Sequence, residues 1–165
     1  AAFLVAISIV LTRFLSVMIP IGGALNVRIG FGRIPLMMSG ILFGPVIGGI
    51  TGFAADFIGM LINPVGQFHP GFALSAILDG VIPGLIFIYY KKHTLSNESY
   101  VTKFRVFVPA FTLTILNSII LNTFWLYTIS GKAVIAALPL RALNAFVNLP
   151  IQVFAIYSIL KNIRD

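Results

Sequence analysis

Long apolar segments alternate with short connections rich in turn-forming residues along the whole chain. A helix needs about 20 apolar residues to cross the ~30 Å hydrocarbon core of a membrane. The pattern predicts six helices, over residues 2–19, 34–43, 45–62, 72–90, 104–127 and 134–160. The second is too short to span alone, and Gly44-Pro45 predicts a break after it, because proline removes a helix hydrogen-bond donor.

The composition supports a membrane location. Hydrophobic residues make up 59% of the chain and charged residues 9%, whereas a soluble domain carries roughly 25% charged residues. The net charge of +7 does not indicate nucleic-acid binding, because the basic residues flank apolar segments and do not cluster on one solvated face. We therefore predict an all-α integral membrane protein of the cell membrane, with residues 1–165 as a single domain.

The distribution of basic residues predicts the orientation. The connection 91–103 is the only long polar one, and with Arg105 it holds four of the eleven basic residues. Lys161 and Arg164 follow the last helix. Because cytoplasmic connections carry an excess of Lys and Arg, this connection and both termini are predicted to be cytoplasmic. The apolar start at residues 2–19 is interpreted as a first span and not as a signal peptide, since no cleavage site accompanies it.

The predicted orientation leaves several basic residues where the topology rule disfavours them. Arg28, Arg33 and Lys132 would lie at the outer face, and Arg13 and Arg141 in the outer halves of their helices. One explanation is a cationic entrance that attracts an anionic ligand. The other is that they are interfacial side chains whose charges reach toward water.

Small residues recur at helical spacing in the second and third predicted helices. Gly40, Gly44, Gly48 and Gly52 stand four residues apart, a pattern that lets helix backbones approach closely within a membrane. Asp56 and Asp79 lie among apolar neighbours in the same part of the chain. Ionisable groups are costly in hydrocarbon, so each of these aspartates is a candidate site residue.

Polar residues of the last three predicted helices fall on stripes at helical spacing. These stripes are Phe72, Ser75 and Asp79; Thr114, Ser118, Asn122 and Trp125; and Arg141, Asn144, Asn148 and Gln152. In the predicted orientation they converge at one level below the outer surface. Such convergence is typical of a ligand pocket, although a single Asn or Ser more often joins neighbouring helices.

The residue types suggest the chemistry of a ligand. Asp79 or Asp56 could accept two parallel hydrogen bonds from an aminopyrimidine edge. Trp125, with Phe72, Phe68 and Phe31, could stack on a flat ring, and an arginine suits a carboxylate. A planar heterocycle that carries carboxylates fits all three. The alternatives are internal ion pairs, Asp56 with Arg13 or Asp79 with Arg141, and a membrane-interface position for Trp125.

Motifs for catalysis and cofactor binding do not appear in the sequence. Gly131-Lys132 is followed by Ala133, and Leu126 stands where a phosphate-binding loop needs its first glycine. The chain has no cysteine, and its two histidines, His69 and His93, are far apart, so no metal site is predicted. We predict that the protein is not an enzyme, needs no cofactor and draws energy for any uphill transport from elsewhere.

The assembled features resemble the substrate-binding S component of energy-coupling factor (ECF) vitamin transporters. The resemblance covers nearly the whole chain: its length, six helices, the basic connection before the fifth helix, and the AxxxA step at Ala2 and Ala6. The runs RIPLMMSGILFGPVIGGITGFAADFIG, QFHPGFALSAILDGVIPG, LNTFWLYTISGK and LPLRALNAFVNLP are most similar to the folate-specific branch.

The resemblance implies a membrane subunit that binds folate at its outer face. It also implies a complex with a transmembrane coupling subunit, on which Ala2 and Ala6 dock, and with two cytosolic ATPases. Transport in this family is thought to involve tilting of the S component in the bilayer. Chemical matching then assigns the pterin to Asp79 or Asp56 and Trp125, and the glutamate carboxylates to Arg141, Arg33 and Arg28.

Three other functions remain open from the sequence. An S component for another vitamin, such as thiamine or its pyrimidine half, fits the same architecture, although the outer arginines disfavour a cation. A small membrane enzyme could use Asp56 and Asp79 as an acid–base or metal pair. A structural subunit would bind partners and no ligand.

Overall fold

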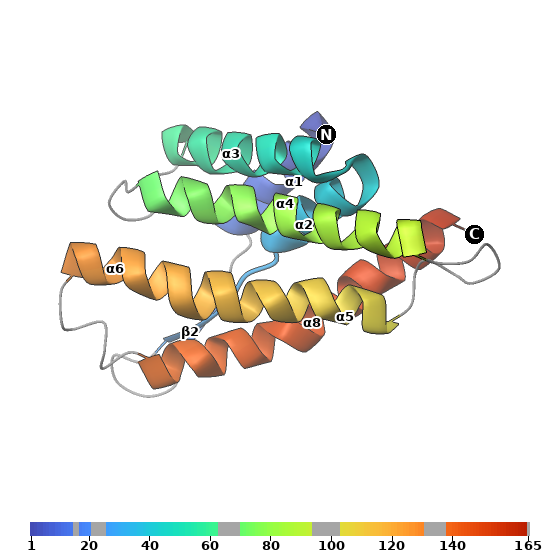
Figure 1. Ribbon diagram of the computed structural model, residues 1–165. Coiled ribbons are helices and arrows are strands. Elements are labelled where there is room, and N and C mark those ends of the chain that lie inside the picture. The colour runs from blue at the N-terminus through green and yellow to red at the C-terminus, as the bar shows by residue number, and fades with distance from the viewer. Residues whose placement is uncertain (15–16, 21–25, 63–69, 94–102, 131–137, 165) are drawn as a thin grey trace.

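The computed structural model spans residues 1–165, and the structure describes 1–14, 17–20, 26–62, 70–93, 103–130 and 138–164 (Figure 1). The described elements are mainly helices. They are α1 (Ala2–Arg13), β1 (Val17–Pro20), β2 (Asn26–Ile29), α2 (Arg33–Phe43), α3 (Pro45–Ile62), α4 (Pro70–His93), α5 (Lys103–Leu113), the π-helix η1 (Thr114–Leu121), α6 (Asn122–Ser130) and α8 (Leu138–Arg164).

The long helices lie side by side along one axis (Figure 1). α5, η1 and α6 follow one another without a gap and form a single long rod. The end of α3, the start of α4, the end of α6 and the start of α8 gather at the left of Figure 1. The end of α4, the start of α5 and the C-terminus lie at the opposite end.

Four helical stretches are long and apolar enough to cross a membrane: Pro45–Ile62, Pro70–Lys92, Lys103–Thr128 and Ala142–Asn162. α1 and α2 are apolar but shorter, with 12 and 11 residues. The helical architecture predicted from the sequence is therefore confirmed, but the first predicted span, 2–19, is too long. α1 ends at Arg13, and the Phe14 amide closes its last turn on the Val10 carbonyl at 3.0 Å.

A β-hairpin between α1 and α2 was not predicted, and it adds two short strands to an otherwise helical fold. β1 pairs antiparallel with β2, with Val17 opposite Ile29 and Pro20 opposite Asn26. Val17, Val27 and Ile29 are β-branched and suit a strand. The Gly, Pro and Asn of residues 19–32 predict turns, but two strands of four residues each are too short to show a clear alternation of apolar and polar positions.

The glycine pattern packs α2, α3 and α4 together. A Cβ at Gly40, Gly48 or Gly52 would collide with the backbone of α4 at Gly80 or Ala76. Close backbone contact is therefore possible only without a side chain. Gly44 has a different role: it ends α2 with φ of 89° and has open space around it, and Pro45 begins α3. The predicted break at Gly44-Pro45 is confirmed.

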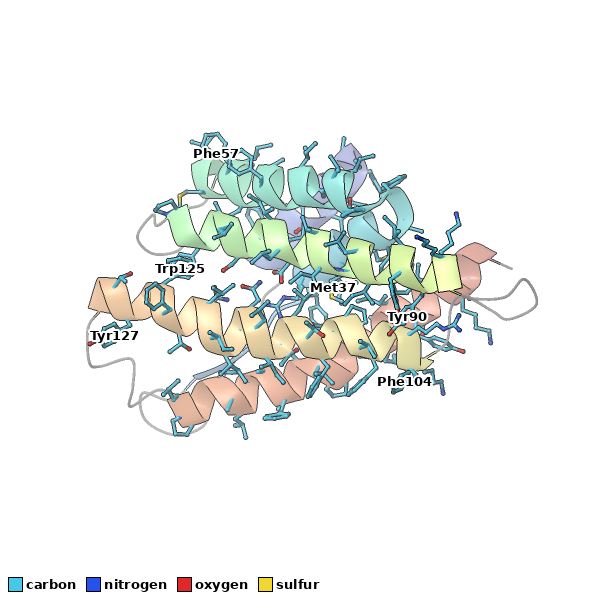
Figure 2. All side chains as sticks on the ribbon, in the orientation of Figure 1. Met37, Phe57, Tyr90, Phe104, Trp125 and Tyr127 are labelled. Carbon is cyan, nitrogen blue, oxygen red and sulfur yellow. The ribbon has the colours of Figure 1, made fainter. Side chains whose placement is uncertain are left out.

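A hydrophobic core joins α2 to the second half of the bundle, which is formed by α5, η1, α6 and α8. Met37 of α2 is fully buried near the centre of the molecule (Figure 2). It packs with Val106 and Leu113 of α5 and with Ile156 of α8, which are also fully buried. The two halves are thus held together at this level by apolar contact.

Candidate functional site

A cavity of about 540 Å³ lies between α1, α2, α3, α4, η1, α6 and α8. Its polar lining comes mostly from hydroxyl, amide and carboxyl side chains, with few charges. The described lining residues are Ser8, Thr12, Gly30, Gly32, Arg33, Leu36, Ala55, Asp56, Met60, Phe72, Ser75, Ala76, Asp79, Thr114, Asn117, Ser118, Asn122, Asn144, Ala145, Asn148 and Gln152.

An ion pair between α2 and α4 forms one wall of the cavity. Arg33 Nε lies 3.1 Å from Asp79 Oδ1, and the two side chains are only 16% and 11% exposed. Arg33 Nη1 also donates to Ser118 Oγ at 2.9 Å. The guanidinium therefore ties α2 to both α4 and η1, and its charge is matched inside the bundle.

Asn117 completes this polar network from η1. Its Nδ2 donates to Asp79 Oδ1 at 2.6 Å and to the Ser75 carbonyl at 2.9 Å. The Asn117 side chain is fully buried. Asp79 Oδ1 thus receives hydrogen bonds from a cation and from an amide, which compensates part of the cost of burying a carboxylate.

Several buried acceptors in the lining have no hydrogen-bond partner among the described residues. They are Asn117 Oδ1, Asn122 Oδ1 and Gln152 Oε1, together with the hydroxyl oxygen of Ser75. Most buried polar atoms in proteins are paired, and leaving one unpaired costs about 1–3 kcal/mol. Unpaired oxygens around a cavity indicate a site that is completed by a ligand or by water.

The segment between β2 and α2 forms part of the cavity lining. The Gly30 amide donates to Asn148 Oδ1 of α8 at 3.2 Å. The Gly32 carbonyl accepts a bond from Ser8 Oγ of α1 at 2.8 Å. A side chain at Gly32 would collide with Thr12. The cavity residues therefore fix the base of the hairpin to helices from both halves of the bundle.

The structure brings together most of the described residues predicted for the site. Those that line the cavity are Asp79, Asp56, Arg33, Phe72, Asn122, Asn144 and Asn148. Arg33, for which a carboxylate-binding role at the outer face was predicted, pairs with Asp79. The suggested pairing of Asp79 with Arg141 lies outside the described residues, because the Arg141 side chain is not described.

Four other side chains lie outside the described residues. These are Phe68, Arg13, Arg28 and Arg141. The predicted stacking by Phe68, carboxylate binding by Arg28 and Arg141, and pairing of Arg13 with Asp56 therefore stay predictions.

Trp125 does not line the cavity in the described part of the chain. Its ring packs on Gly71 at the start of α4, where any Cβ would meet the indole, and Figure 2 shows it between α6 and α4. Phe72, the next residue along α4, is the aromatic side chain that the described lining contains.

Asn117, Ser8 and Thr12 line the cavity but were not predicted from the sequence as site residues. Asn117 lies off the stripe defined by Thr114 and Ser118 at α-helical spacing, but it carries the central amide of the network. An Asn inside a long apolar segment could have indicated this role, because polar residues in membrane helices usually face the interior of the bundle. Ser8 and Thr12 share one face of α1 at a spacing of four residues, a pattern that is weak in so short a helix.

Ala2 and Ala6 lie on the exposed side of α1, with the large apolar side chains Phe3 and Val10, which are 76% and 46% exposed. Among the described residues no group of three or more His, Cys, Asp or Glu side chains could hold a metal ion.

Comparison with known proteins gives the family. The model of the ECF transporter substrate-specific component matches residues 1–161. The chain is an ECF transporter S component. It is 40% identical over 157 residues to the folate transporter FolT of Clostridium novyi (strain NT), which covers 95% of this chain and 83% of that protein. The resemblance drawn from the sequence is confirmed, as is a multi-pass membrane location.

Two solved structures share the fold of this S component. A crystal structure of FolT bound with folic acid aligns with a TM-score of 0.73 at 31% identity, over 94% of this chain and 88% of that one. The S component of a bacterial ECF transporter aligns with a TM-score of 0.62 at 24% identity, over 99% and 94% of the two chains. The family is a transport component, which argues against the membrane-enzyme alternative.

Proposed function

We propose that this S component binds folate in the cavity between its helices and delivers it to an ECF importer. The observation that carries the proposal is the likeness to FolT, in sequence over 95% of the chain and in fold to a FolT that holds folic acid. The cavity supports it, because about 540 Å³ is within the ~300–1,000 Å³ of ordinary small-molecule sites.

The lining chemistry suits the pterin end of folate. The aminopyrimidine edge of a pterin offers adjacent N–H donors, which a carboxylate accepts well. Asp79 Oδ1 already accepts from Arg33 and Asn117, so we assign one N–H of the amino edge to Oδ2. Phe72 would stack on the ring. Arg28 and Arg141 keep their proposed role of attracting the glutamate carboxylates.

We propose that both termini are cytoplasmic and that the site opens on the outside. The end of the bundle opposite the hairpin carries exposed Lys91, Lys92 and Lys103. Lys103 lies over the Tyr157 ring and Arg105 over the Tyr90 ring, each 5.7 Å from the centroid. A basic end of this kind faces the cytoplasm under the positive-inside rule.

The remaining part of the proposal concerns partners. The exposed Ala2 and Ala6 face of α1 would dock on a transmembrane coupling subunit, since small residues allow close helix contact. Two cytosolic ATPases would supply the energy, and the S component would tilt to present folate inward.

The first experiment identifies the ligand. The full chain is purified from membranes, denatured, and its released small molecules are identified by mass spectrometry. Equilibrium dialysis then measures folic acid and thiamine binding. We expect folate in the extract and saturable folic acid binding at micromolar concentration or below. Thiamine in the extract, or tighter binding of thiamine, would overturn the folate assignment.

The second experiment tests the residue assignment. Asp79→Asn keeps the size of the side chain but turns one acceptor into a donor, so folic acid affinity should fall by about 10-fold or more, because one buried bond of this kind is worth ~1–3 kcal/mol. Asp56→Asn is the matched control on the other wall, and Arg28→Ala should have a smaller effect. Equal small effects of all three changes would contradict the role of Asp79.

A further inference from the structure

Asp79 has one carboxylate oxygen that the protein holds and one that is left for a ligand. Within the described part of the chain, the bonds to its side chain all end on Oδ1, from Arg33 Nε at 3.1 Å and from Asn117 Nδ2 at 2.6 Å. The side chain lines the cavity and is 11% exposed. Oδ2 is therefore the atom through which Asp79 meets a ligand, and the two bonds on Oδ1 set its direction.

Asn117 belongs to the same wall of the cavity but presents no surface to a ligand. Its exposed fraction is 0%. An asparagine amide has two hydrogens to donate, and both are used, one on Asp79 Oδ1 and one on the Ser75 carbonyl. Any effect of Asn117 on ligand affinity must therefore pass through a neighbour, and Asp79 is the bonded neighbour that carries a charged group into the lining.

The two bonds of Asn117 fix the Asp79 carboxylate relative to α4. The last side-chain torsion of an aspartate is broad, so a carboxylate without fixed partners can turn about it. Ser75 stands four residues before Asp79, about one turn of the same helix. Asn117 thus holds both the carboxylate and the turn of α4 that carries it. With Oδ1 fixed in this way, Oδ2 has a defined direction before a ligand arrives.

Arg33 and Asn117 act on Asp79 in different ways. The guanidinium of Arg33 supplies the opposite charge, on a long side chain with many rotamers. The amide of Asn117 is neutral, stands on a short side chain and makes the shorter of the two bonds, 2.6 Å against 3.1 Å. Arg33 therefore compensates the charge of the carboxylate, whereas Asn117 contributes mainly to its orientation.

The backbone of η1 places Asn117 opposite Asp79. The Asn117 carbonyl accepts from the amide of Asn122, five residues further on, which is the hydrogen bond of a π-helix. Turns of this kind are rare and occur frequently at functional sites. The wider turn takes Asn117 off the α-helical stripe of Thr114 and Ser118 and brings its amide to α4.

We propose that Asn117 is a positioning residue for the ligand: it aims Asp79 Oδ2 at the amino edge of the pterin without contacting the ligand itself. This inference rests on the proposed folate function and adds a residue on which folate affinity depends through Asp79 alone. It separates the affinity of the site from the stability of the bundle, because the Arg33–Asp79 pair remains when Asn117 is changed.

The test is a double-mutant cycle in folic acid affinity, measured by equilibrium dialysis on the purified full chain. Asn117→Leu keeps the approximate volume and removes both donors. It should weaken binding by about 5–10-fold, because the ligand must then order the carboxylate itself. In the Asp79→Asn background the same change should weaken binding by no more than about 2-fold, because the carboxylate that Asn117 orients is absent. Equal fold losses in the two backgrounds, or no loss in the native background, would overturn the proposal.

A second measurement separates positioning from support of the fold. Asn117→Leu should lower the SDS concentration at the unfolding midpoint by much less than Arg33→Met, because the charges of Arg33 and Asp79 stay paired. Asn117→Ala removes the same donors with a smaller side chain and should give the same result. A midpoint shift as large as that of Arg33→Met, or failure of both Asn117 variants to fold, would show a structural role and overturn the proposal.

Thr112→Val is the control for a polar change on the same rod. Thr112 lies outside the described lining, and its hydroxyl bonds to the Val108 carbonyl of its own helix at 2.9 Å. Its folic acid affinity should equal that of the native chain, and a loss equal to that of Asn117→Leu would argue against a specific effect of Asn117.

The two proposals fail differently. If the native chain binds no folic acid, the proposed function fails, and the inference fails with it. If the native chain binds folic acid and Asp79→Asn weakens binding, but Asn117→Leu does not, the proposed function stands and the positioning role of Asn117 is wrong.

Discussion

The Arg33–Asp79 ion pair permits a quantitative test of how the bundle is held together. Both side chains are largely buried, Arg33 Nε lies 3.1 Å from Asp79 Oδ1, and each has one further polar neighbour, Ser118 for Arg33 and Asn117 for Asp79. Removing one partner of a buried pair leaves an uncompensated charge and typically costs ~3–5 kcal/mol. Replacing both with apolar residues often costs little.

The perturbation is a double-mutant cycle with Arg33→Met, Asp79→Leu and the double variant. Asp79→Leu should cost more than Arg33→Met, because a guanidinium cannot lose its charge whereas a carboxylate can bind a proton. We expect the Asp79 variant near the upper end of ~3–5 kcal/mol, and the double variant to be more stable than either single one.

The assay is unfolding of the purified protein in mixed micelles with increasing SDS, followed by circular dichroism, with size-exclusion chromatography to confirm that each variant is folded. The interaction free energy is the difference between the double variant and the sum of the singles. Values of ~0.5–3 kcal/mol are usual for residues in contact. Strict additivity would refute the argument that the charges stabilise each other.

Three further predictions concern packing and partners. Gly80→Ala should destabilise the bundle by ~1–3 kcal/mol, because its Cβ would meet the Gly48 carbonyl; the SDS titration measures it. Gly71→Ala should shift the emission maximum of Trp125, the only tryptophan, because the new methyl group displaces the indole ring. Ala6→Trp on the exposed face of α1 should abolish co-purification with a coupling subunit while folate binding persists.

Matched controls make these outcomes interpretable. Gly30→Ala adds the same methyl group where nothing lies within 4 Å, so its stability should match the native chain; a loss equal to that of Gly80→Ala would contradict the packing argument. An unchanged spectrum in Gly71→Ala would contradict the Trp125 contact. Leu74→Trp, at a side chain of α4 that is 46% exposed, should leave partner binding intact, and equal losses at both positions would argue against a specific α1 surface.

The local spacing of residues predicted much of this structure. Glycines four residues apart gave the close contact of α3 with α4, and Gly44-Pro45 gave the break after α2, because both signals act within one or two helical turns. Asp79, Asn144 and Asn148 could be placed in one site because polar residues within apolar helices must face the interior of a bundle.

The incorrect predictions concern features that a single helical period of 3.6 residues does not describe. The stripe through Thr114, Ser118 and Trp125 assumes 3.6 residues per turn, but Thr114–Leu121 is a π-helix, in which the hydrogen bonds span five residues. The wider turn brings Asn117 into the cavity and leaves Trp125 beside Gly71. The Arg33–Asp79 pair was not predicted, because local spacing does not show which residues of two different helices face each other across the bundle.

The short helix α1 has a consequence for the surrounding lipid. At 1.5 Å per residue α1 is about 18 Å long, whereas the hydrocarbon core is ~30 Å thick, and α1 carries exposed apolar side chains such as Phe3 and Val10. α2 is also short, but Ile34–Gly40 are buried within the bundle. An apolar helix that is shorter than the bilayer is matched by local thinning of the lipid or by association with another helix, at a cost of fractions of a kcal/mol per Å of mismatch. α4 and α8 present full-length apolar surfaces, so the lipid beside α1 differs from the lipid beside these long helices.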